Sequence, residues 1–120
     1  MDNRVKVILC NSVIHIDIGK QRNSDDEDAY EKRLRSFAKD RLYDSIVMAL
    51  NNRDYFMAEQ FSNRLLIKSY NLGMVRLANR CDELRIAMLN GKGSPLFSDE
   101  ISNVTAVYRS MRDCINRAFK

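Results

Sequence analysis

The sequence contains no tryptophan, one proline, four glycines and one histidine among its 120 residues. With so little proline and glycine, the chain has few of the residues that interrupt helices. Hydrophobic residues make up 45% of the chain and charged residues 30%. This composition is typical of one compact domain, and it favours a helical one.

The sequence also lacks a long apolar run, so we expect no membrane insertion. Its first stretch, MDNRVKVILCNSVIHI, interrupts apolar residues with charge and does not have the layout of a signal peptide. The cysteines are odd in number and form no CxxC pair; they are Cys10, Cys81 and Cys114. We therefore expect reduced thiols in a cytoplasmic protein, with Cys81 and Cys114 at apolar helical positions in the core.

The net charge is +4, and the basic residues are scattered among 16 acidic ones. A nucleic-acid-binding protein more often gathers its basic residues on one face, so we expect no nucleic-acid partner. The sequence has no glycine-rich phosphate loop, and its carboxylates do not show the spacing of metal ligands. We accordingly expect no cofactor and no metal.

Residues 1–13 include RVKVILC, in which Val5, Val7 and Leu9 alternate with Lys6 and Ile8. This alternation predicts a short extended arm, although Ile8 interrupts it. A short helix is expected next, over residues 16–21.

The stretch NSDDEDAY predicts the start of the first long helix. Ser24 can cap it while Glu27, three residues later, completes a capping box, and Asp25 and Asp26 complement the helix dipole. The helix is expected to run to about Leu50, where NNRD follows. Its apolar positions are Tyr30, Leu34, Phe37, Ile46, Ala49 and Leu50.

Three more amphipathic helices are expected. One begins near Asp54 and stops at Gly73, and the next ends at the turn-like NGKGSP. The apolar positions of the last are Phe97, Ile101, Val104, Tyr108, Met111, Ile115 and Ala118. The sequence therefore predicts an all-α fold, an antiparallel up-and-down four-helix bundle over residues 14–120 that follows the arm of residues 1–13.

From His15 to the C-terminus the chain resembles a histidine-containing phosphotransfer (HPt) domain, the intermediate carrier of phosphorelays. The family pattern reads A-H-x-L-K-G-x-x-x-x-L-G, followed by L-x-x-x-C-x-x-L, with an aspartate nine residues before the histidine. Asp54 lies at that distance. Without gaps, the matching positions are Leu65, Leu72, Gly73, Leu77, Cys81 and Leu84.

The chain departs from the family at three positions that carry its chemistry. Asn63 replaces the phospho-accepting histidine, Leu66 the lysine and Ile67 the glycine. An asparagine amide nitrogen is delocalised into its carbonyl and is not a usable nucleophile. Leucine cannot neutralise phosphoryl charge, and isoleucine fills the space that glycine leaves for a receiver domain. His15, the one histidine, precedes the bundle, and we expect it to be structural or solvated.

At 100° per residue, the second long helix has a core side and an opposite side centred on Asn63. The core side comprises Met57, Ala58, Phe61, Leu65, Ser69 and Leu72. The candidate partner-binding residues on and beside the opposite side are Phe56, Asn63, Arg64, Leu66, Ile67, Lys68, Tyr70 and Met74. A helix that is apolar on two sides must bury both or associate with a partner.

Three interpretations of this second face remain open from the sequence. The arm covers it, two copies pair through it as a homodimer, or another protein docks on it. The resemblance implies a non-catalytic HPt-like regulator, not an enzyme, whose partner is the receiver domain of a response regulator or a hybrid histidine kinase. The alternative is an interaction or assembly protein, either a monomer or a homodimer, with partners unrelated to phosphorelay.

Overall fold

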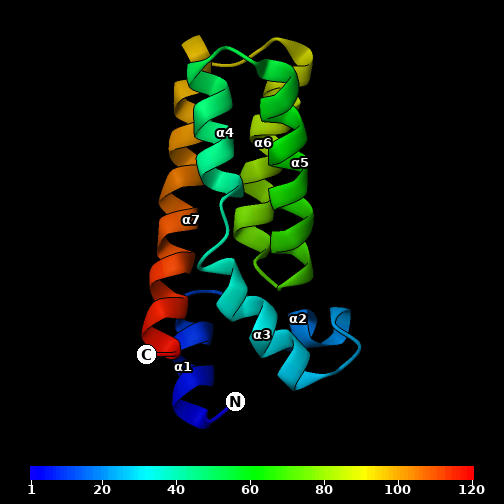
Figure 1. Cartoon of the computed structure of the whole chain (residues 1–120), viewed down its shortest axis with the longest axis vertical. Coiled ribbons are helices and arrows are strands. Elements are labelled where there is room, and N and C mark those ends of the chain that lie inside the picture. The colour runs from blue at the N-terminus through cyan, green and yellow to red at the C-terminus, as the bar shows by residue number, and fades with distance from the viewer.

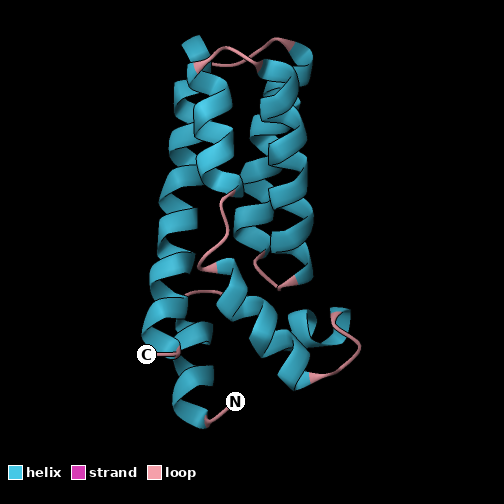
Figure 2. Ribbon diagram, in the orientation of Figure 1, coloured by secondary structure: helices cyan, strands magenta, loops and turns pink.

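The computed structural model describes residues 1–120, and all of its regular structure is helical (Figures 1 and 2), which confirms the expected all-α fold class. The elements are α1 (Asn3–Asn11), α2 (Ile16–Arg22), α3 (Glu27–Phe37), α4 (Leu42–Asn51), α5 (Tyr55–Asn71), α6 (Val75–Asn90), the 3-10 helix η1 (Pro95–Phe97) and α7 (Ser98–Ala118). None of the helices combines the length and the apolar character that crossing a bilayer requires.

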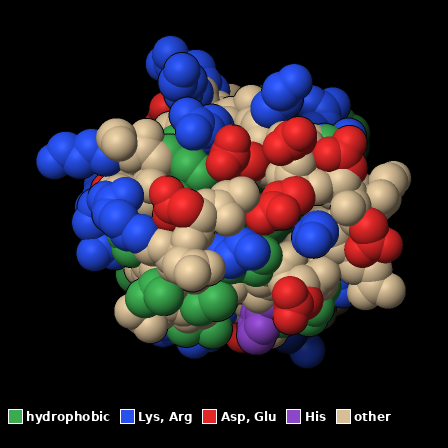
Figure 3. Space-filling model, turned by 90° about the horizontal axis from the view of Figure 1, so that it is seen from below, with side chains coloured by type: hydrophobic (Ala, Val, Ile, Leu, Met, Phe, Trp, Pro, Cys, Tyr) green, Lys and Arg blue, Asp and Glu red, His purple; other side chains and the backbone are tan.

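The molecule is elongated, with principal extents of 44 × 25 × 19 Å. In its upper part α4, α5, α6 and α7 run alongside one another, and α5 packs against both α4 and α6 (Figure 1). At the other end α1 lies beside the C-terminal part of α7, while α2 and α3 lie below the end of α5. Seen from this end, basic and acidic side chains are interspersed over the surface (Figure 3).

One hydrophobic core runs through the molecule. The apolar positions predicted for the last helix are confirmed from Val104 onward, because these side chains are buried, whereas Phe97 and Ile101 are only half-buried. Cys81 and Cys114 are buried, as predicted from their helical positions. The spacing of apolar residues therefore located the core faces of the long helices correctly.

The prediction of an extended arm is wrong, because residues 3–11 form α1. The Asp2 side chain caps it by accepting a hydrogen bond of 2.9 Å from the backbone N–H of Val5. Val5 and Leu9 are buried and Val7 is exposed. Residues four apart share one face of a helix, so the pair Val5 and Leu9 satisfies helical as well as strand spacing.

Helix α1 packs against α7 and α2. The Arg4 guanidinium donates to the backbone oxygens of Arg117 at 3.3 Å and Ala118 at 3.5 Å, the last carbonyls of α7. The interpretation that the arm covers the Asn63 side of α5 is therefore wrong, since α1 is held at the far end of the molecule (Figure 1).

The sequence predicted that the first long helix runs without a break to about Leu50, and this prediction is wrong. Helix α3 ends at Phe37, and α4 begins at Leu42. The Asp40 carboxylate accepts a hydrogen bond of 2.7 Å from the Leu42 N–H at the start of α4. At 100° per residue, the apolar stripe of α4 is rotated by about 140° from that of α3. A straight helix would bury one stripe and expose the other, so the break lets both face the core.

The expected capping box is also replaced. Ser24 and Asp25 adopt positive φ angles of 61° and 55°, and Asp26 caps α3 by accepting a hydrogen bond of 3.1 Å from the Ala29 N–H. Since the turn continues two residues beyond Ser24, the helix starts at Glu27.

Segments α2 and α3 close the C-terminal end of α5. The Tyr30 hydroxyl donates to the carbonyl oxygen of Leu72 at 2.7 Å, and the His15 N–H donates to that of Gly73 at 2.9 Å. Carbonyls at a helix end lack partners within the helix. In α5 the carbonyls of Tyr70 and Asn71 accept hydrogen bonds from side chains of the α2 segment. The bonds to Leu72 and Gly73, which follow α5, hold α3 and the short helix α2, predicted at 16–21 and found at Ile16–Arg22, against the α5–α6 turn.

Candidate functional site

The candidate site is the exposed side of α5 around Asn63, together with a groove beside it. Helix α5 begins after Asp54, whose carboxylate accepts a hydrogen bond of 3.1 Å from the Met57 N–H. Its buried side carries small residues, and Ser62 and Ser69 satisfy their hydroxyls by donating to carbonyls one turn earlier at 2.7 Å. Small side chains there let α5 lie close to its neighbours, which leaves Asn63 on the outer side.

Most of the predicted partner-binding residues are exposed. The exposed ones are Phe56, Asn63, Arg64, Ile67, Lys68 and Tyr70. Phe56 is 72% exposed, Ile67 50% and Tyr70 48%. Phe56 lies at the first turn of α5, two turns before Asn63, so the face around Asn63 itself is formed by Arg64, Ile67 and Tyr70.

Met74 does not belong to this face, and its prediction is wrong. It is fully buried, because α5 ends at Asn71 and Gly73 turns the chain with a φ of +78°. Counting 100° per residue beyond the end of the helix placed Met74 on the wrong side. Leu66 is half-buried and packs against the core, so its contribution to an outer surface is partial.

Two cations border this face. Lys68 forms an ion pair with Asp40, which follows α3, so part of its charge is neutralised within the protein. Arg64 places its guanidinium 5.8 Å from the centre of the Phe61 ring. None of the ion pairs in the structure involves Arg64.

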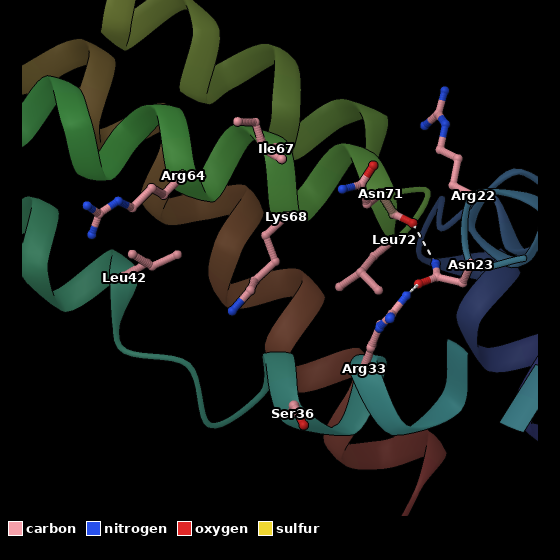
Figure 4. Close-up of a pocket in the computed structure, with 10 residues that line it drawn as sticks. All are labelled: Arg22, Asn23, Arg33, Ser36, Leu42, Arg64, Ile67, Lys68, Asn71 and Leu72. Atoms are coloured by element: carbon pink, nitrogen blue, oxygen red, sulfur yellow. Dashed lines mark hydrogen bonds between the residues drawn. The ribbon is translucent and has the colours of Figure 1, made fainter. Parts of the chain in front are cut away.

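A groove of about 660 Å³ lies along α5 beside Arg64 and Lys68, between this helix and the segments α2, α3 and α4 (Figure 4). Its lining residues are Arg22, Asn23, Arg33, Ser36, Leu42, Arg64, Ile67, Lys68, Asn71 and Leu72. Four of these side chains are cationic and none is acidic. The groove exists because the break at residues 38–41 lets α3, which precedes the break, point away from α5 (Figure 4).

Asn23 is the buried polar residue that organises one end of this groove. Its amide nitrogen donates to the carbonyl oxygens of Gly19 at 2.6 Å and Asn71 at 2.9 Å. Its amide oxygen accepts a hydrogen bond from the Arg33 guanidinium. Asn23 is 3% exposed, so Arg33 is held at the groove by a partner that is itself fixed.

Arg22 lies at the same end, with its guanidinium directed away from Arg33 and Lys68 (Figure 4). Its guanidinium lies 3.4 Å from the centre of the Tyr70 ring and donates to the Tyr70 carbonyl oxygen at 2.5 Å. Tyr70, predicted as part of an open apolar face, is therefore partly covered by a cation from α2. This stacking is a cation–π contact that fixes the guanidinium plane.

The site contains neutral amides, cations and apolar side chains. No histidine, cysteine or carboxylate lines the groove. His15 is exposed at the start of α2, where its backbone contacts the α5–α6 turn. Nowhere do three metal-ligating side chains come together. The arrangement is suited to recognising a surface or an anion by contact.

Comparison with protein-family models, with curated proteins and with solved structures finds no match for this chain. The resemblance to HPt domains accordingly rests on the residues quoted from the sequence.

The sequence correctly predicted that Arg64, Ile67 and Lys68 lie close together, because they share one helix. It missed Arg22, Asn23 and the rest of the groove's far wall. These residues come from α2 and α3, and no spacing along the chain relates them to α5. The one available signal was local: the last carbonyls of α5 need hydrogen-bond partners, and polar side chains from other segments are one source of them.

Proposed function

We propose that this protein is a non-catalytic relative of HPt domains, which regulates a phosphorelay by binding the receiver domain of a response regulator or hybrid histidine kinase. In this proposal α4 to α7 correspond to the family's up-and-down four-helix bundle, and α5 corresponds to the helix that carries the phospho-accepting histidine.

The observation that carries the proposal is the position of Asn63. It is exposed midway along α5, on the side away from the core, where the family pattern has its histidine. Since its amide nitrogen has no available lone pair, it cannot form a phosphoramidate and release it. A domain that keeps the surface and loses the nucleophile is left with binding as its mode of action.

The surroundings of Asn63 suit a receiver domain's active face, which is an acidic pocket with an apolar margin. Ile67 supplies an exposed apolar contact, and Arg64 supplies a guanidinium without a carboxylate partner. Opposite charges across an interface increase the association rate and fix the orientation of the partners. The expected partner therefore meets Arg64 with carboxylates and Ile67 with apolar side chains.

The binding test compares Ile67→Glu with Ile86→Glu in a pull-down against a panel of receiver domains. Ile67 and Ile86 are 50% and 44% exposed, and Ile86 lies on α6. We expect wild type and Ile86→Glu to retain a receiver domain and Ile67→Glu to lose it. Equal binding by the wild type and both variants, or binding by none of the three, contradicts the proposal.

The catalytic part has its own test. We expect no radiolabel on this protein after incubation with a receiver domain that carries a labelled phosphoryl group. Stable label on the wild type would overturn the proposal, and its loss or persistence in His15→Ala would show whether His15 accepts the phosphoryl group.

A second candidate function is assembly through a different surface. Four large apolar side chains are exposed near the α4–α5 and α6–α7 connections. They are Met48, Phe56, Leu89 and Leu96. Exposed apolar side chains that form one continuous patch often mark an association surface. Sedimentation of wild type and Phe56→Glu tests it: a dimer that the substitution dissociates would favour this candidate.

A further inference from the structure

The groove between α3 and α5 carries more positive charge than the carboxylates of the protein neutralise. Of its four cations, only Lys68 has a carboxylate partner. The ion pairs of the structure include neither Arg22 nor Arg33 nor Arg64. Like charges that share one concavity repel each other, and a bound anion relieves that repulsion.

Two of these arginines are held in place by neutral groups. Arg33 donates to the amide oxygen of Asn23, and Arg22 stacks on Tyr70 and donates to its carbonyl. The Arg22 guanidinium points away from the space between α3 and α5 (Figure 4). Arg33 uses one of its five N–H donors on Asn23 and keeps the others for a ligand. A neutral partner fixes the side chain without neutralising it, and a fixed side chain loses less entropy on binding.

The direction of the side chains indicates where an anion would lie. Arg33 and Lys68 extend into the space between α3 and α5, and Arg64 extends toward Leu42 at the other end of the groove (Figure 4). Lys68 bonds to Asp40 through one of its three N–H donors, which leaves two. The space between Arg33 and Lys68 is thus bordered by donors from both walls.

The groove is not purely polar. Leu42, Ile67 and Leu72 line it as well, and its volume of about 660 Å³ lies within the range of small-molecule sites. Inorganic phosphate would leave these apolar surfaces uncovered. A ligand with an anionic end and an organic ring would use both kinds of lining.

We infer that this groove binds an organic phosphate of nucleotide size. Its phosphate groups lie between Arg33 and Lys68, and its organic part lies against Leu42, Ile67 and Leu72. The inference goes beyond the proposed function and is independent of it, because the ligand is bound in the absence of any receiver domain.

The test uses ADP as the probe, with pyrophosphate and adenosine for comparison, in calorimetry and in amide NMR titrations without added metal. We expect saturable ADP binding that weakens as salt is raised, with shifts at Asn23, Lys68 and Asn71. Pyrophosphate should bind more weakly than ADP, and adenosine should not bind.

Arg33→Gln removes a charge-assisted contact and should weaken ADP binding about tenfold or more. Arg80→Gln is the matched control, because Arg80 pairs with Glu83 on α6 and should leave binding unchanged. Ser36→Glu tests the site without touching the Asn23–Arg33 contact: it adds a carboxylate at an exposed position of α3 and should abolish binding.

Absence of saturable ADP binding to the folded wild type would overturn the inference. So would equal affinities for Ser36→Glu and Arg80→Gln, or shifts confined to residues outside the groove. Tighter binding of an acidic peptide than of ADP, at the same residues, would also contradict it and assign the groove to a polypeptide.

Discussion

Gly73 joins the α5–α6 turn to α2. Its φ of +78° lies in the left-handed region, and a Cβ added there would lie 2.2 Å from the backbone oxygen of His15. The contact is with backbone, which cannot rotate away. Glycine is therefore required at this position for two reasons: the positive φ of the turn and the close approach of the α2 backbone.

We predict that Gly73→Ala destabilises the protein much more than Gly91→Ala. Gly91 also has a positive φ, of +61°, but an added Cβ meets nothing there within 4 Å. Its substitution should cost about 1 kcal/mol for the left-handed backbone alone. Gly73→Ala should cost about 3 kcal/mol or more, because the α2 contact must also shift. Urea unfolding measures both values, and equal losses would mean that α2 is not docked at the turn.

The three cysteines should differ in reactivity. Cys10 is exposed, whereas Cys81 and Cys114 are buried, and burial raises the pKa of the Cys81 thiol to about 12. The thiolate is the reactive form, so at neutral pH Cys81 is both inaccessible and protonated. We expect iodoacetamide to label one site in the native protein and three in denaturant, as counted by mass spectrometry. Labelling of Cys81 in the native protein would contradict the described packing.

At the scale of elements, α1 is an integral part of the core. Its residues Val5 and Leu9 belong to the same buried cluster as α7, and the Cys114 thiol donates to the Ile8 carbonyl oxygen at 3.5 Å. An arm that merely lay on the surface would contribute little to stability.

We therefore predict that Leu9→Ala lowers the free energy of unfolding by about 2–5 kcal/mol, as expected for a fully buried leucine. Val7→Ala on the exposed side of the same helix should change it by less than about 0.5 kcal/mol. Thermal or urea unfolding of the two variants gives the comparison. Similar small effects would indicate that residues 1–13 are an arm after all.

The break between α3 and α4 positions the groove. It lets the stripe of Leu34 and Phe37 and the stripe of Ile46 and Leu50 both face the core, and it directs α3 away from α5. The rotation between these stripes is visible in the sequence, because Phe37 and Ile46 are nine residues apart and lie about 180° from each other on one helix. Helical spacing within each half was recognised, and the mismatch between the halves was not.

At the scale of the whole molecule, stability should be lost at both ends of the pH range. Hydrogen bonds from the backbone N–H and hydroxyl of Ser94 lower the pKa of Glu100 below its usual 4.5. Burial raises the pKa values of Tyr30 and Cys81 above their usual 10.0 and 9.0. A lowered carboxyl pKa stabilises the fold above pH 4.5, and the contribution is lost as the pH falls through the folded value. The raised values give contributions that are complete below pH 9 and lost as the pH rises through the folded values.

We predict a plateau in Tm between about pH 5 and pH 9, with a decline on either side. Glu100→Gln should lower Tm on the plateau and make the acid decline shallower, because one proton-linked interaction is removed. Glu83→Gln is a suitable control, since Glu83 is exposed on α6. Calorimetry across the pH range tests this, and an unchanged acid slope in Glu100→Gln would contradict it.

The sequence by itself determined the all-helical class, the core faces of α5, α6 and α7, and the outward position of Asn63, because helical periodicity is local and each helix must bury one stripe. It also determined the departure from the HPt pattern at Asn63, Leu66 and Ile67. Only the tertiary structure decided that α1 packs on α7 and that Met74 is buried.

The tertiary structure alone also brought Arg22 and Arg33 to the groove beside Lys68. These outcomes depend on contacts between segments far apart in the chain, for which the spacing of residues within one helix carries no information. The physical reason is the need to satisfy the end of α5 and to bury two stripes that point in different directions.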